Sequence, residues 1–227
     1  MPRFSRHIAA AATLLFLAGC GAETDGDDGN GSAAADPTNE AAATELEGVE
    51  HFYGEYGDYV SVMAAIQAGE VTAEELEHPF VVQQDHVDAQ DPTAVPEYEL
   101  SPPVGGDHLS VWQTCTGSVY PDPIADGNGV HSMEHGAVWL TYDPALVDGD
   151  GIGLLRSKIE GRDYSLMSPY PEQGVAVSLQ SWGNRYQTED LDDPMIEAYL
   201  DTYILNERFN PETMATCSDG ISTTIAR

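Results

Sequence analysis

Positive charge is nearly missing from this sequence of 227 residues. It contains 8 lysines and arginines, of which Lys158 is the single lysine, against 39 aspartates and glutamates, and its formal net charge is −31 at pH 7. A surface of this kind repels the phosphates of nucleic acids and the anionic head groups of lipids. We therefore expect no nucleic-acid partner, and we expect a solvated acidic surface whose self-repulsion is relieved by salt.

Cysteine is also scarce, with 3 residues in the chain. Two of them, Cys115 and Cys217, lie in the part of the sequence that can fold. In an exported protein such a pair predicts a disulfide. The bond would close a loop of about 100 residues and contribute about 4–5 kcal/mol in the chain-entropy model. The alternative is that one or both thiolates bind a metal ion.

The N-terminal apolar run, Ile8 to Leu17, is too short to span a bilayer as a stable helix. It follows the basic residues Arg3 and Arg6, and it ends at Cys20 in a Leu-Ala-Gly-Cys sequence that resembles a bacterial lipoprotein signal. Residues 1–20 are therefore predicted to be a lipoprotein signal peptide. Cys20 would carry lipid and hold the protein on the extracytoplasmic face of the cell membrane. The alternative is an ordinary secretory signal in which Cys20 is incidental.

Several catalytic motifs are absent from the sequence. There is no G-x-S-x-G elbow, no phosphate-binding glycine loop with a lysine, and no C-x-x-C pair. The sequence therefore favours a binding protein over an enzyme, and it leaves a protein partner unspecified.

Three regions follow from composition and periodicity. Residues 21–45 are rich in Gly, Ala and Asp and lack aromatic residues, which predicts a disordered tether after the signal peptide. Residues 46–227 predict a single compact α+β domain with a small mixed or antiparallel sheet and flanking helices. We expect helices over 47–68, after the capping box at 72–75, over 152–159 and from 193 onward; strands over 80–83, 137–142, 164–167 and 175–179; and loops over 91–107 and 121–129.

Potential metal ligands are densest at residues 130–136, Val-His-Ser-Met-Glu-His-Gly. His131 and His135 are four residues apart, so one helical turn would place both imidazoles on the same face. His86 and His108 lie beside predicted strands, where each could approach that pair. Because imidazole is the commonest metal ligand in proteins, these four histidines predict a metal site.

The methionines near these histidines bear on which metal is bound. Thioether sulfur beside imidazole selects copper, whereas imidazole with carboxylate suits zinc. Met133 lies between two of the histidines, and Met214 lies close to Cys217. We therefore predict copper, with zinc as the alternative. The predicted ligands are His86, His108, His131, His135, Met133 and Met214.

Two other interpretations use the same residues. The sequence His131 to His135 fits H-x-x-E-H, the pattern of zinc peptidases in which two histidines hold zinc and Glu134 activates water. Such enzymes need a long helix around the motif, and here Gly136 and an apolar run follow it directly. In the other interpretation, Glu134 and the histidines form a buried hydrogen-bond network in a structural or partner-binding lipoprotein.

Blocks distributed over about 130 residues resemble the domain-of-unknown-function family 3105, which contains exported and membrane-anchored bacterial proteins. The resemblance implies a shared fold and a shared histidine-centred site, but no activity. The family usually has leucine at the position of Met133 and a Ser-Gly-Pro-His turn at residues 105–108. The matching blocks are residues 85–87, 101–108, 112–120, 130–138, 168–171, 181–183 and 211–212, with Cys217.

Overall fold

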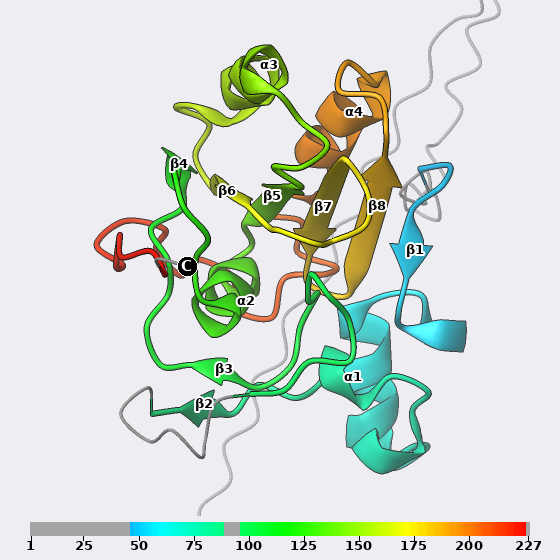
Figure 1. Cartoon of the computed structure of the whole chain (residues 1–227). Coiled ribbons are helices and arrows are strands. Elements are labelled where there is room, and N and C mark those ends of the chain that lie inside the picture. Colours follow the sequence, from blue (N-terminus) through cyan, green and yellow to red (C-terminus); the bar gives the residue numbers. More distant parts are fainter. Residues whose placement is uncertain (1–45, 89–95, 226–227) are drawn as a thin grey trace, which may run out of the picture. The chain divides into compact units, whose positions relative to one another are not determined.

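The structure is a computed structural model that describes residues 46–88 and 96–225 (Figure 1). The predicted signal peptide and tether, residues 1–45, lie outside the described residues. Within the described part, four α-helices surround one six-stranded mixed sheet, and a second, two-stranded sheet lies beside it. The predicted single α+β domain with a small mixed sheet is therefore confirmed. None of the described helices has the length and apolar character needed to cross a membrane.

The larger sheet has the strand order β1-β8-β7-β5-β6-β4. Strand β6 lies between β4 and β5, and both of these neighbours run parallel to it. The remaining pairs, β5 with β7, β7 with β8, and β8 with β1, are antiparallel. The strands are β1 (Glu50–His51), β4 (Thr116–Val119), β5 (Val138–Tyr142), β6 (Ser165–Pro169), β7 (Val177–Ser181) and β8 (Asn184–Thr188).

The small sheet consists of β2 (His86–Val87) and β3 (His108–Leu109), which are parallel to each other. The α-helices are α1 (Tyr59–Ala68), α2 (Asp126–Glu134), α3 (Gly149–Ile159) and α4 (Pro194–Tyr203), and three short 3-10 helices are η1 (Gly54–Tyr56), η2 (Ala73–Glu75) and η3 (Pro79–Val81). Helix α2 contacts both β3 and β5, so it joins the small sheet to the large one.

The apolar core lies around the central strands of the large sheet. Every residue of β5, β6 and β7 is buried. Trp139 on β5 and Leu200 on α4 are both 0% exposed and belong to the same core cluster. Burying side chains of this size stabilises the fold by about 1.5–3 kcal/mol each, and it gives α2 a rigid surface to pack against.

Several predicted elements differ from the structure. Residues 80–83 were expected to form a strand, but η3 occupies residues 79–81 because Pro79 stands at its first position and cannot donate to a sheet ladder. The helix expected over 47–68 begins only at Tyr59, after Gly57 in a left-handed conformation at φ 75°. The loop expected over 121–129 is wrong in its second half, where α2 begins. The capping box at Thr72 is confirmed.

The cysteine pair forms a disulfide between Cys115 and Cys217, across a sequence separation of 102 residues. The bond is buried, and the Cys115 amide also donates to the carbonyl of Cys217. The predicted disulfide is confirmed, and the alternative in which these thiolates bind metal is wrong for this state of the protein.

Candidate metal centre

The small sheet brings the first two histidines together. His86 on β2 and His108 on β3 are direct partners in the parallel register. The His108 amide donates to the Asp85 carbonyl at 3.0 Å, and the Ser110 amide donates to the Val87 carbonyl at 3.1 Å. As a result the two imidazole centroids are 4.7 Å apart.

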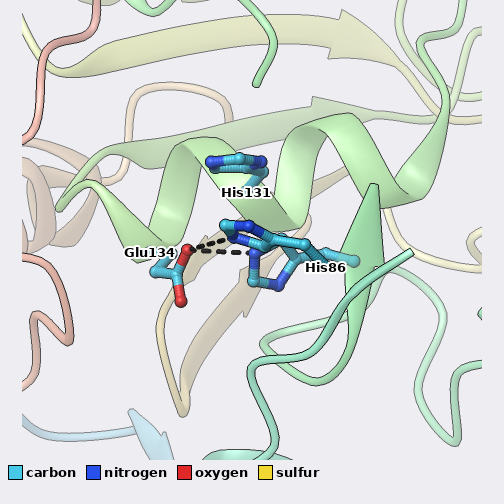
Figure 2. Close-up of side chains that lie close together, drawn as sticks. His86, His131 and Glu134 are labelled. Atoms are coloured by element: carbon cyan, nitrogen blue, oxygen red, sulfur yellow. Dashed lines mark hydrogen bonds and ion pairs between the residues drawn. The ribbon is translucent and has the colours of Figure 1, made fainter. Parts of the chain in front are cut away.

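Helix α2 supplies the other two side chains, His131 and Glu134, which are three residues apart and therefore share a face. The His131 ring lies 4.7 Å from His86 and 4.8 Å from His108, measured between centroids. Figure 2 shows Glu134 turned toward His86, with His131 on the adjacent turn of the same helix. Three segments that are far apart in the sequence thus converge at the last turn of α2.

The sequence of α2 is poor in helix formers, and close packing explains why it forms a helix here. A Cβ atom added at Gly127 would lie 2.7 Å from Leu109 of β3, and one added at Gly129 would lie 2.6 Å from Trp139 of β5. Both glycines are buried. Their missing side chains let the helix backbone approach the two sheets closely enough for His131 to reach the site.

Helix α2 ends at the glycine of the H-S-M-E-H-G block. Gly136 has φ 92°, which favours glycine, and its amide donates to the Met133 carbonyl. The Ala137 amide donates to the Ser132 carbonyl, so the two bonds form a Schellman motif. This motif stops the helix one residue after Glu134 and directs the chain into β5.

Four donor atoms, one each from His86, His108, His131 and Glu134, lie within 4.8 Å of one another, and this group could hold a metal ion. Glu134 Oε2 is 2.9 Å from His108 Nε2 and 3.3 Å from His86 Nε2. His108 Nε2 is nevertheless buried without an aligned hydrogen bond in the described part of the chain.

Backbone carbonyls fix the tautomers of the buried histidines. His108 Nδ1 donates to the Gly106 carbonyl at 2.8 Å, and His131 Nδ1 donates to the Leu109 carbonyl at 2.6 Å. A carbonyl oxygen can only accept, so in a neutral ring Nε2 carries the lone pair. Metal-binding histidines are oriented in this way, with the other ring nitrogen donating to a carbonyl or carboxylate.

Burial favours the neutral form of the His131 and His135 imidazoles. It lowers the pKa of His131 to about 4 and also lowers the pKa of His135. Burial alone would raise the pKa of the Glu134 carboxyl, but the interactions with His108 and His86 outweigh it and hold that pKa below its usual range. At neutral pH the site therefore presents unprotonated His131 beside an ionised carboxylate.

The structure places the remaining predicted ligands outside this group of four. His135 lies beside it, with its ring 4.7 Å from His131, but its Nε2 is 3.6 Å from Glu212 Oε2 and its Nδ1 donates to the Thr216 carbonyl. Met133 is 0% exposed within the apolar core. Met214 is 93% exposed.

Glu134 belongs to the group, although the sequence suggested it as a catalytic base or as a member of a buried hydrogen-bond network, and not as a metal ligand. Its spacing of three residues from His131 is the sequence signal that could have identified it as a candidate ligand. The arrangement also differs from that of the H-x-x-E-H peptidases, in which both motif histidines hold zinc and the glutamate stays free. Here the carboxylate is inside the donor group and the second histidine, His135, is outside it.

Comparison with known proteins adds a family but no relative of established activity. No curated protein and no solved structure matches the chain. A family described as "Protein of unknown function (DUF3105)" matches residues 86–219, a span that contains all four donors and both cysteines of the disulfide. The chain therefore belongs to the DUF3105 family.

Proposed function

We propose that this protein binds one divalent transition-metal ion through His86, His108, His131 and Glu134. The observation that carries the proposal is that several hydrogen-bond acceptor atoms lie close together in the buried site. His108 and His131 have committed their Nδ1 protons to carbonyls, so their Nε2 lone pairs face a carboxylate with no donor between them. Such a buried arrangement is unfavourable until a cation enters it.

The donor set favours zinc over monovalent copper. Three imidazole nitrogens and one carboxylate oxygen suit Zn²⁺, and Cu²⁺ is the next candidate because it also binds imidazole strongly. The prediction of copper rested on a thioether ligand together with the expected extracytoplasmic compartment. Met133 is packed in the core and Met214 is exposed to solvent, so neither supports that choice.

Metal uptake by protein purified without a histidine tag tests the proposal. We expect about one zinc ion per chain in equilibrium dialysis, and X-ray absorption at the zinc edge should show nitrogen and oxygen neighbours at about 2.0–2.2 Å with no sulfur. His131→Ala should abolish uptake. His78→Ala serves as the matched control, because His78 is not one of the four donors and its ring packs against Phe52 and Phe80.

Thermal unfolding separates this function from a structural histidine–glutamate network. A ligand at 100 times its Kd stabilises the folded state by about 2.7 kcal/mol, so saturating zinc should raise Tm by several degrees, and a chelator should reverse the shift. If zinc and chelator both leave Tm unchanged, and if no ion is retained on dialysis, the four side chains form only a structural network.

We also propose that the metal-binding domain is held at the outer surface of the cell membrane by lipid on Cys20. The support is the sequence at residues 17–20 after a short apolar run. Mass spectrometry of the membrane-bound protein should find a lipid-modified N-terminal cysteine. The Cys20→Ser variant should lose the modification and the membrane association, and recovery of unmodified wild-type protein in the soluble fraction would contradict this proposal.

A further inference from the structure

The four donors differ sharply in their exposure to solvent. The side chains of His108 and Glu134 are 0% and 2% exposed, and His131 is 3% exposed. The side chain of His86 is 43% exposed. Three donors thus lie inside the protein, and the fourth stands at its surface.

His86 is also held less firmly than the buried histidines. The Nδ1 atoms of His108 and His131 are tied to carbonyls, whereas His86 Nδ1 makes no hydrogen bond within residues 46–88 and 96–225. Its strand, β2, has two residues and, among the described residues, pairs with β3 alone. The ring can therefore rotate away from Glu134 without breaking the main-chain bonds that hold β2.

Aromatic side chains cover other sides of the group. Trp182, which is 1% exposed and donates to the Val81 carbonyl, meets the His108 ring edge-on at 5.9 Å. The Trp112 ring lies 5.7 Å from the His131 ring. His86 is the donor that reaches solvent. It is flanked in the sequence by Asp85 and Val87, and the exposed carboxylate of Asp85 attracts cations.

We propose that His86 is an exchangeable ligand and that the bound ion leaves on its side, to an acceptor that offers a nitrogen or sulfur donor. The step is a ligand substitution. The bond between the metal and His86 Nε2 breaks, a bond to the acceptor forms, and His108, His131 and Glu134 hold the ion meanwhile. No electron is transferred. This inference rests on the proposed function and deepens it, because it makes the site a transfer site for the metal.

The rate at which zinc passes to a chelator tests the inference. Zinc-loaded protein is mixed with excess 4-(2-pyridylazo)resorcinol, and the coloured complex is followed in time. We expect the rate to rise in proportion to the chelator concentration, since the chelator attacks the ion while the buried donors still hold it. His86→Ala should still bind zinc and should release it at least about tenfold faster. His78→Ala should behave like the wild type.

The outcomes separate the two proposals. A wild-type protein that takes up no zinc overturns both. A wild-type protein that binds zinc but releases it at a rate independent of the chelator concentration overturns only the exchange through His86. Loss of zinc binding in His86→Ala, with an unchanged circular dichroism spectrum, does the same, because His86 would then be as necessary as the buried ligands.

Chemical modification gives a second readout at the residue itself. Diethylpyrocarbonate carbethoxylates accessible imidazole nitrogens, and the modified residues are identified by mass spectrometry. In metal-free protein His86 should react while His108 and His131 do not, and zinc should slow the reaction at His86 by about tenfold or more. Equal reactivity of His86 with and without bound zinc would show that it is not a ligand, and this would overturn the inference.

Discussion

Glu134 is a carboxylate buried beside His108 and His131, whose Nδ1 protons are donated to backbone carbonyls. Removing an ionised carboxylate from water costs several kcal/mol unless a cation or a set of donors compensates. His86 Nε2 lies 3.3 Å from its Oε2 and can donate to it, which compensates in part. A divalent ion among the four donors would compensate more completely, because each lone pair would then point at positive charge.

Glu134→Gln keeps the size of the side chain and removes its charge. Loss of an outer-shell partner typically weakens metal binding about 10–100-fold, and the loss of a ligand should exceed that range. Isothermal titration with zinc measures the change. Unchanged affinity, combined with a lower Tm of the metal-free variant, would instead identify Glu134 as a structural hydrogen-bond acceptor.

The sequence predicted the approach of His86, His108 and His131 from their density and from their positions beside strands. It could not predict the side-chain directions. His135 shares the helical face of His131, yet the Schellman motif ends the helix at that point and the His135 ring is turned toward Glu212 and Thr216. The position of Met133 on the helix surface turns its side chain into the core. The density of potential ligands in the sequence carries no information about that direction.

Helix α2 shows how tertiary packing overrides local preference. Its first half contains Gly127 and Gly129, which cost roughly 1 kcal/mol each relative to alanine in a helix. The sequence therefore predicts a loop over this part of the chain. The structure places these glycines at the closest approaches to Leu109 and Trp139, contacts that only the folded chain reveals.

Gly129→Ala should destabilise the protein although alanine is the better helix former. The added Cβ would lie 2.6 Å from the Trp139 ring, which is itself fully buried. Overpacking of this kind typically costs about 1–3 kcal/mol, more than the gain in propensity. Denaturant unfolding measures the difference, and zinc affinity should fall as α2 is displaced.

Gly153→Ala in α3 is the matched control. Apart from the neighbouring backbone of α3 itself, no atom lies within 4 Å of the Cβ position at Gly153, so only the propensity gain remains, about 0.5–1 kcal/mol of added stability. Equal effects of the two substitutions would contradict the packing explanation of α2.

The carboxylate of Asp58 caps helix α1 and also forms an ion pair. Asp58 accepts a hydrogen bond from the Ser61 amide at 2.7 Å, and it pairs with Arg208 through both Nε and a terminal guanidinium nitrogen. Burial alone would raise the pKa of Asp58, but these hydrogen bonds outweigh it and hold the pKa below its usual range. The carboxylate thus joins α1 to the segment after α4.

Asp58→Ala should cost about 1–3 kcal/mol at pH 7, through loss of the cap and of the charged hydrogen bonds. Because the folded pKa is the lower one, this stabilisation is fully present above the unfolded pKa of about 3.9 and is lost as the pH falls through the folded pKa. The gap in unfolding free energy between wild type and variant should therefore narrow below about pH 4. Asp122→Ala, at an exposed position, should open no such gap.

At the scale of the whole molecule, the strand order could not be predicted from the sequence. The strands at 138–142, 165–169 and 177–181 are apolar runs that sequence reasoning found, with shifted bounds. Their pairing, with β4 and β5 on either side of β6, depends on packing between distant segments. Strands β2 and β3, which carry two of the donors, have two residues each and leave no periodic signal.

The disulfide should contribute about 4–5 kcal/mol to stability in the chain-entropy model, because it closes 102 residues of sequence. The Cys115→Ala/Cys217→Ala double variant should unfold at a lower denaturant concentration by the corresponding amount. Reductant should destabilise the wild type and leave the variant unchanged. Zinc affinity should be nearly retained, since none of the four donors is a cysteine.

The disulfide between Cys115 and Cys217 also prevents the two cysteines from binding a metal ion as thiolates. Thiolate sulfur competes strongly with imidazole for zinc and for copper. The backbone carbonyl of Thr216, next to Cys217, accepts a hydrogen bond from His135 Nδ1, so the cysteine pair lies one residue from a contact of His135. Under reducing conditions the two free thiolates would compete with the imidazole site for the metal ion. Metal uptake measured in buffers that contain a thiol reductant would then report binding at both sites. Selective loading of the proposed imidazole site would thus require the disulfide to form before the metal binds.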